Sequence, residues 1–302
     1  MSTTSHNNYM ARTNDMVLAT LLKDQTLSTA ECTRNIFWAS EGPQHGYFEE
    51  ISPEHLRSKE QSPLISRVYK DQWLQVSRAK KHAEVFTPAW ICNAQNNLVD
   101  EQWFGRKPVF NAEITDTDGT HSWQTIHSRI EFPPNRNWTQ YVRSRRMEMA
   151  CGEAPYLTSR YDATTGRLIP MSERIGILDR KFRIIDENIP VHPTPANKRK
   201  WLRRAYQALQ ATYGFDWQGD NVFLARESVF CTFCDNYHKR WRKFPNSSIM
   251  GKAAEIISWN IWQMDGTSFT VPHTCTPCLI MNWKGTEPLE GETVVFKQLI
   301  KK

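Results

Sequence analysis

The sequence lacks a long apolar run and an apolar signal core. No stretch reaches the roughly eighteen apolar residues that a membrane-spanning helix needs, and residues 1–15 are polar. The mean hydropathy is −0.61. We therefore expect a cytoplasmic protein with no membrane partner.

The sequence also lacks the pattern of a disulfide framework. Its 7 cysteines are an odd number, and no secretory signal accompanies them, so reduced thiols are expected. Two Cys-x-x-Cys pairs, Cys231/Cys234 and Cys275/Cys278, could supply four thiolates to a structural zinc. The first pair falls in a predicted helix without a glycine turn, so we assign no metal ligand. A zinc-stapled interaction domain stays open as an alternative.

The composition predicts a folded, basic protein. The 302 residues are 39% hydrophobic and include 12 Trp, enough for a sizeable core. The pattern predicts an N-terminal extension of helices and loops over residues 1–80 and a main domain over 81–302. The net charge of +6 suits a polyanionic partner.

Clusters of basic residues also favour a polyanionic partner. They occur at residues 143–146, 198–204 and 238–243, some interleaved with Trp. Phosphate neutralisation with aromatic stacking favours double-stranded DNA as the partner, although each cluster alone could be a solvated surface.

The segment from Arg146 to Leu157 predicts a buried strand that passes through a tight loop into a helix. Cys151 and Gly152 lack bulk and Ala154 is small, so the backbone could approach a ligand closely. The amides of the following helix would then point at that ligand. The loop is a candidate nucleotide-binding loop, and an ordinary turn is the alternative.

Hydrophobic periodicity predicts alternating elements downstream of this loop. Helices are expected over residues 196–211 and 221–240, and strands over 212–216 and 255–259. An acid at the end of a strand beside such a loop can accept ribose hydroxyl protons, which makes Asp216 the candidate. An exposed turn Asp is the alternative for this residue.

Upstream of the loop, Pro88 predicts the first turn of a helix over residues 89–102. Trp90 and Leu98 are among its expected core-facing side chains. Residues 105–132, with a Thr-Asp-Gly turn, predict a hairpin or a loop excursion.

These motifs resemble those of one family. Cys151 to Leu157 resembles the Cys-Gly-x-Gly-x-Phe-Leu loop of S-adenosylmethionine-dependent adenine-N6 DNA methyltransferases of restriction-modification systems. Glu148 stands where that family has Asp, and Ala154 replaces its second Gly. Ala83 to Pro88 resembles the family's Phe-Thr-Pro element, and Tyr213 to Asp216 with Leu224 to Arg226 is similar to its second nucleotide motif. The run from Ala83 to about Pro272 is similar to the short bacterial proteins called restriction endonuclease subunit M.

The resemblance implies a Rossmann-like methyltransferase sheet that binds S-adenosyl-L-methionine and acts on double-stranded DNA, beside a restriction or specificity subunit. Few residues follow Trp262, so the sheet could be incomplete. The implied cofactor-binding residues are Phe86, Thr87, Pro88, Glu148, Cys151, Gly152, Glu153 and Asp216.

The family's catalytic tetrapeptide, Asn or Asp followed by Pro-Pro-Tyr, is missing. Adenine's exocyclic amine is a poor nucleophile, so an amide must accept its protons while an aromatic ring stacks on the flipped base. Asn260-Ile261-Trp262-Gln263 stands at the expected place, which makes Asn260 the predicted acceptor and Trp262 the predicted stacking ring. Asn282 is a weaker candidate. A non-catalytic DNA-binding or partner subunit that keeps the fold is the alternative reading.

Overall fold

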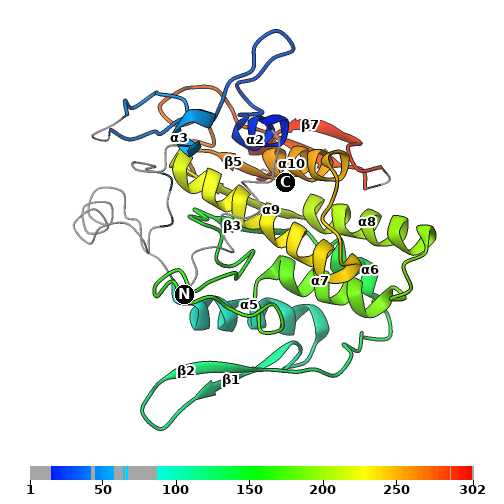
Figure 1. Ribbon diagram of the computed structural model, residues 1–302. Helices are drawn as coiled ribbons and strands as arrows, with labels where there is room; N and C mark the ends of the chain where they lie inside the picture. The colour runs from blue at the N-terminus through cyan, green and yellow to red at the C-terminus, as the bar shows by residue number, and fades with distance from the viewer. Residues whose placement is uncertain are drawn as a thin grey trace. The chain divides into compact units, whose positions relative to one another are not determined.

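The chain divides into two units, and a three-stranded sheet forms the centre of the first. The computed structural model describes residues 15–41, 45–57, 64, 66, 87–285 and 287–300. The first unit comprises Met1–Ile65, Met147–Ala154 and Tyr213–Lys302, and the second comprises Ser66–Arg146 and Pro155–Thr212. Helices and small sheets mix along the chain, so it is an α/β protein, as expected (Figure 1).

The sheet consists of β3 (Arg146–Met149), β4 (Thr212–Asp216) and β5 (Ile261–Gln263), with β4 in the middle. β4 is buried throughout and runs parallel to β5, with Asp216 opposite Gln263. The strand predicted over 212–216 is confirmed. The three strands lie side by side in chain order, so the strand order does not reverse among them. In a doubly wound sheet, the ligand binds where the strand order reverses.

Two helices cover β5 in the first unit. α9 (Gly219–Trp241) and α10 (Ser247–Asn260) both pack on β5 and on each other, and α10 also packs on α2 (Asp15–Leu22). The helix predicted over 221–240 is confirmed. The short helix α3 (Pro53–Arg57), the hairpin of β6 (Leu279–Trp283) and β7 (Gly291–Val295), and α11 (Phe296–Ile300) complete the unit.

Arg226 joins these elements from inside α9. Its guanidinium is buried and donates to the carbonyls of Ile261 at 2.7 Å, Leu21 at 2.7 Å, Lys23 at 2.9 Å and Ser258 at 3.0 Å. Burial lowers its pKa to about 10. Arg226 therefore satisfies carbonyls at the C-terminal ends of α2 and α10, which have no partner inside their own helices.

The strand predicted over 255–259 is wrong, because these residues lie in α10. Asn246 caps that helix by accepting the N–H of Ile249 at 2.9 Å. Within the helix, residues 253, 254, 256 and 257 are buried, a spacing that fits one helical face and not an alternating strand. The strand β5 begins only at Ile261.

The second unit is mainly helical. It contains α5 (Ala89–Phe104), α6 (Trp138–Val142), α7 (Ile177–Asn188) and α8 (Pro195–Gln210), and an antiparallel hairpin of β1 (Asn111–Thr115) and β2 (His121–Thr125). The helices predicted over 89–102 and 196–211 and the hairpin are confirmed. α7 packs on both α6 and α8.

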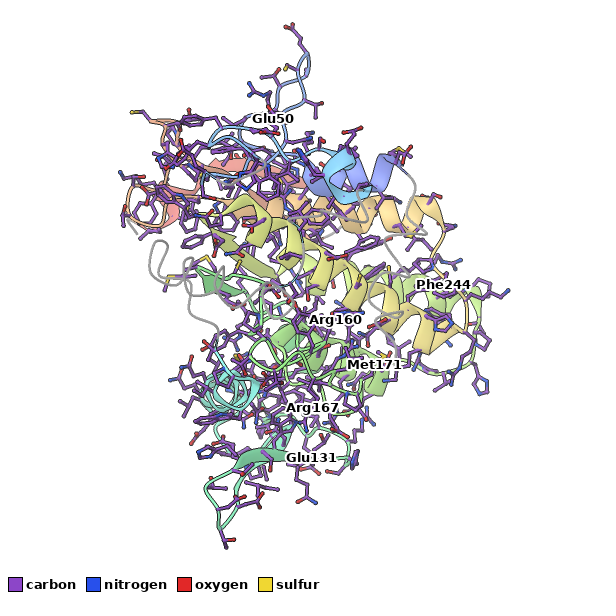
Figure 2. All side chains as sticks on the ribbon, turned by 60° about the vertical axis from the view of Figure 1, so that its left-hand side comes forward. Glu50, Glu131, Arg160, Arg167, Met171 and Phe244 are labelled. Carbon is purple, nitrogen blue, oxygen red and sulfur yellow. The ribbon has the colours of Figure 1, made fainter. Side chains whose placement is uncertain are left out.

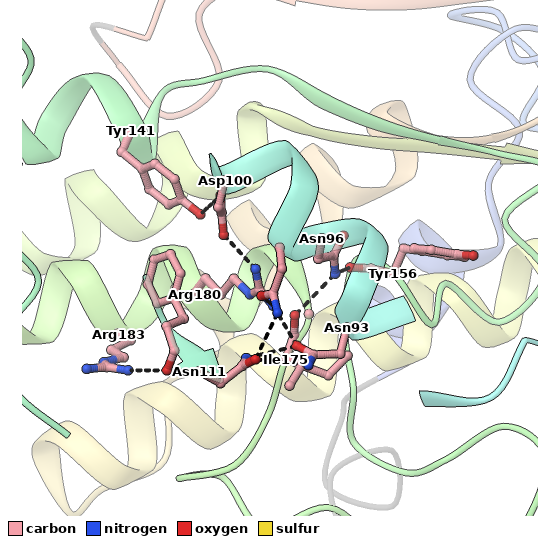
Figure 3. A network of polar contacts seen from close by, with 12 residues as sticks. Asn93, Asn96, Asp100, Asn111, Tyr141, Tyr156, Ile175, Arg180 and Arg183 are labelled. Atoms are coloured by element: carbon pink, nitrogen blue, oxygen red, sulfur yellow. Dashed lines mark hydrogen bonds and ion pairs between the residues drawn. The ribbon is translucent and has the colours of Figure 1, made fainter. Parts of the chain in front are cut away.

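A buried polar network holds the second unit together (Figure 3). Arg180 of α7 donates to Asp100 at 2.6 Å and to the side-chain oxygens of Asn93 and Asn97 at 2.9 Å each. Tyr141 donates its hydroxyl to the other oxygen of Asp100 at 2.7 Å. Three polar residues of α5 thus face the interior, while the apolar Leu98 is 53% exposed. The expectation that Leu98 and Trp90 face the core is wrong.

Candidate functional site

The loop after β3 has an unusual backbone. Ala150, Gly152 and Ala154 have φ angles of 49°, 52° and 61°, a left-handed region that costs energy for a residue with a Cβ. The N–H of Cys151 bonds to the carbonyl of Phe215 at 2.8 Å, and the N–H of Ala154 bonds to that of Cys151 at 2.7 Å. Since strained residues cluster at functional sites, the loop stays the first candidate.

The predicted helix after this loop is wrong. Residues 150–176 form turns, bends and irregular segments, and the next helix, α7, begins at Ile177. Among the described residues, no helix N-terminus directly follows the loop to direct amides at a ligand. A Cβ at Gly152 would meet no atom of the described residues within 4 Å, so these residues leave the loop backbone open on that side.

Asp216 lies against this loop. One oxygen of its carboxylate accepts the N–H of Gly152 at 2.9 Å, and the other accepts the N–H of Gln218 at 2.9 Å and the side-chain amide of Asn221 at 3.2 Å. Burial raises the pKa of Asp216, and these hydrogen bonds oppose that rise. The structure thus brings Gly152 and Asp216 together, with the carboxylate already engaged by its own chain.

The neighbouring loop residues are buried. Cys151 is 1% exposed, and burial, with Asp216 and Glu148 nearby, raises the pKa of its thiol well above the usual value. Glu148 and Glu153 are also buried. A Cβ at Gly214 would come within 3.2 Å of the Cys151 sulfur, so a larger residue there would require Cys151 to move by a few tenths of an ångström. Burial and the raised pKa both favour the neutral thiol form of Cys151.

Asn260 and Trp262 are both buried, and neither lies beyond the end of the strand. Asn260 is the last residue of α10 and accepts the indole N–H of Trp283 at 2.7 Å. Trp262 lies within β5, with its indole N–H 3.3 Å from the Met264 sulfur, and its ring packs 5.2 Å from that of Phe296. The amide-aromatic pair therefore belongs to the core of this unit.

Different residues follow the carboxyl end of β5. Met264 donates its N–H to the carbonyl of Asp216 at 2.9 Å, and Asp265 comes next. The Asp265 carboxylate accepts the N–H and hydroxyl of Thr267 at 2.8 and 2.7 Å and the hydroxyl of Ser268 at 2.8 Å. Burial raises the pKa of Asp265, but these hydrogen bonds outweigh it and lower the pKa. Sequence reasoning missed Asp265, although Asp-Gly after an apolar run is a turn signal.

The Phe-Thr-Pro element belongs to the second unit. Phe86 lies outside the described residues, and Thr87 and Pro88 lead directly into α5. Pro88 precedes the first helical residue, Ala89, whose N–H donates to the Asp162 carboxylate at 2.9 Å. The Pro88 carbonyl accepts the N–H groups of Ile91 at 3.0 Å and Cys92 at 3.2 Å, so Pro88 starts this helix.

The zinc alternative gains no support. Within the described ranges, no three or more His, Cys, Asp or Glu side chains are grouped to hold a metal ion. Cys231 and Cys234 are buried in α9, and Cys275 is exposed. The buried pair packs as small hydrophobic side chains.

Comparison with protein-family models, curated proteins and solved structures finds no match to this chain. In the part of the chain that the structure describes, no helix has the length and apolar character to cross a membrane.

Proposed function

We propose that this chain binds S-adenosyl-L-methionine and acts as an adenine-N6 DNA methyltransferase-like protein of a restriction-modification system, built on a Rossmann-like sheet. One observation carries the proposal. The Cys-Gly loop after β3 and the acid that ends β4 are joined by the hydrogen bond from Gly152 to Asp216. The sequence predicts both motifs as parts of one cofactor site, and ligands of parallel α/β sheets bind outside the carboxyl ends of the strands.

The residues present fit such a cofactor. The open side of Gly152 lets a ligand approach the loop backbone, and Asp216 holds that loop in its left-handed conformation. The Asp216 oxygens keep lone pairs beyond those used by Gly152, Gln218 and Asn221, since a carboxylate has about four acceptor positions. When bound, the cofactor would supply the methyl group.

For catalysis, Asp265 is the better candidate for accepting the amine protons of adenine. It follows the strand beside Asp216, at the edge where the resembled enzymes carry Asn or Asp, whereas Asn260 lies in a helix and is bonded to Trp283. Its lowered pKa keeps Asp265 ionised and able to accept a proton or a hydrogen bond. Asp265 therefore takes the role of proton acceptor that the resemblance gives to Asn260.

Transfer of labelled methyl groups to duplex DNA, followed by digestion and identification of N6-methyladenine, tests the activity. Asp265→Asn is expected to lower the rate on the order of a hundredfold, the usual loss when a preorganised acceptor is impaired. Asp118→Asn is the matched control, because Asp118 also accepts a turn N–H, from Thr120 at 2.9 Å. Full activity in Asp265→Asn would remove Asp265 from the mechanism.

A non-catalytic subunit with the same cofactor site is the second candidate. The burial of Asn260 and Trp262 favours it, because the sequence offers no Pro-Pro-Tyr turn elsewhere after β5. Cofactor binding by wild type without methyl transfer, with or without a partner restriction or specificity subunit, would select this reading.

A further inference from the structure

Basic side chains gather on α6 and α8 of the second unit. α8 contains Lys198, Arg199, Lys200, Arg203 and Arg204 and no Asp or Glu. α6 packs against α8, and Arg143 caps the C-terminal end of α6. Two clusters about sixty residues apart in the sequence therefore meet on one helix pair.

Arg204 is held in place by an aromatic ring. Its guanidinium carbon lies 5.2 Å from the ring centroid of Trp138, the first residue of α6. One of its terminal nitrogens donates to Gln207 at 2.8 Å, and its buried Nε has no acceptor among the described residues. At this distance the ring attracts the guanidinium through a cation–π interaction, which restricts its position.

Three arginines converge at this position. Arg203 and Arg204 are adjacent in α8, and Arg143 ends α6, which packs on α8. Burial lowers the pKa of Arg204, and the positive charges of Arg203 and Arg143 lower it further. No ion pair with a carboxylate is recorded for them in the described residues. Trp138 lies five residues before Arg143, so the rise along the axis of α6 separates their backbones by about 7–8 Å. Grouped cations without an acidic partner are the arrangement that binds an anion.

We propose that Arg143, Arg203 and Arg204 form a binding site for the phosphodiester backbone of a nucleic acid, with Trp138 as the residue that positions Arg204. A phosphodiester fits because a planar guanidinium binds phosphate oxygens through two parallel hydrogen bonds. The inference deepens the proposed function and rests on it for the choice of nucleic acid as partner. It requires no methyl donor.

The test is the affinity of the full chain for a fluorescently labelled duplex between about 50 and 200 mM salt, measured without cofactor by anisotropy. Arg143→Gln with Arg203→Gln removes two exposed charges. The affinity at the lowest salt should fall on the order of tenfold. The slope of log affinity against log salt should shrink by about 1.8, or by about 1.4 for a single strand.

The double variant Arg167→Gln/Lys252→Gln is the matched control, because both side chains are exposed, both lie outside the three basic clusters, and the variant loses the same charge (Arg167 is labelled in Figure 2). It should change the slope little. Equal losses in the two double variants would show a general charge effect and overturn the site, as would an unchanged slope in Arg143→Gln/Arg203→Gln or salt-independent binding by wild type.

Two further measurements separate the alternatives. Trp138→Leu should weaken binding and Trp138→Phe should restore most of it, since a ring keeps the guanidinium in place; equal binding by both variants would remove the positioning role. Calorimetry with S-adenosyl-L-methionine alone reports on the cofactor site, so failure of the phosphate site and failure of the proposed function give different results.

Discussion

Replacing Asp216 should destabilise the protein whether or not a cofactor is present. The carboxylate is 7% exposed and accepts from Gly152, Gln218 and Asn221. Asp216→Ala leaves these buried donors without an acceptor, each at a cost of about 1–3 kcal/mol. Removal of a buried charge offsets part of that cost, because burial already raises the pKa of this group. A net loss of about 2–4 kcal/mol in the free energy of unfolding is expected.

Asp216→Asn separates the hydrogen bonds from the charge. Its amide keeps one acceptor oxygen but turns an NH₂ group toward one set of donors, so a loss of about 1–2 kcal/mol is expected. Urea unfolding followed by Trp fluorescence measures both variants. Asp118→Ala is the control, because solvent can replace its turn hydrogen bond to Thr120, and its midpoint should shift much less. A wild-type midpoint in Asp216→Ala would refute the idea that this carboxylate holds the loop.

The pH dependence gives a second check on Asp216. The pKa of Asp216 is raised in the native state, so the native protein binds this proton more tightly than the unfolded chain does. The contribution of the carboxyl to stability is fully present below its unfolded pKa of about 3.8 and is lost as the pH rises through its native pKa. The difference in unfolding free energy between wild type and Asp216→Asn should therefore be largest in acid and narrow with rising pH. A difference that widens instead would contradict the burial argument.

Two other perturbations test the rest of the structure. Asp100→Ala leaves the guanidinium of Arg180 buried without its carboxylate and should lower the free energy of unfolding by about 3–5 kcal/mol. Lys107→Ala breaks the exposed ion pair with Glu113 and should lower it by about 1 kcal/mol or less in the same urea titration. Equal losses in the two variants would contradict the buried network. Native protein should react rapidly with a thiol reagent only at the exposed Cys32 and Cys275, and rapid labelling of Cys151 would show that the loop opens.

The sequence predicts the elements whose periodicity is strong. The helices after Pro88, Thr194 and Gln218 were expected within a few residues, since each has a clear start signal or a long apolar pattern. The buried strand ending at Asp216 was expected for the same reason. The pairing of Gly152 with Asp216 also follows, because neighbouring parallel strands bring their carboxyl ends to one edge.

Other features depend on partners distant in sequence. α5 buries the side-chain amides of Asn93 and Asn97 because Arg180, about eighty residues later, donates hydrogen bonds to them. A prediction that places the apolar face of this helix in the core therefore chooses the wrong side. The segment before Ile261 is apolar enough for a strand, yet the Asn246 cap and the packing against α2 make it a helix. That difference moves the expected catalytic position from Asn260 to Asp265. The absence of a helix after Gly152 is not visible in local propensity either.

Calorimetry with S-adenosyl-L-methionine tests the central claim most directly, together with a matched pair of glycine variants. Gly152 and Gly119 both have a positive φ, at 52° and 82°, and a Cβ at either would meet no atom within 4 Å in the part of the chain that the structure describes. Only Gly152 lies in the proposed cofactor loop. We expect wild type and Gly119→Val to bind one cofactor per chain, and Gly152→Val to bind at least on the order of tenfold more weakly, a difference of about 1.4 kcal/mol. No heat with folded wild type, or equal binding by the two variants, would contradict the account.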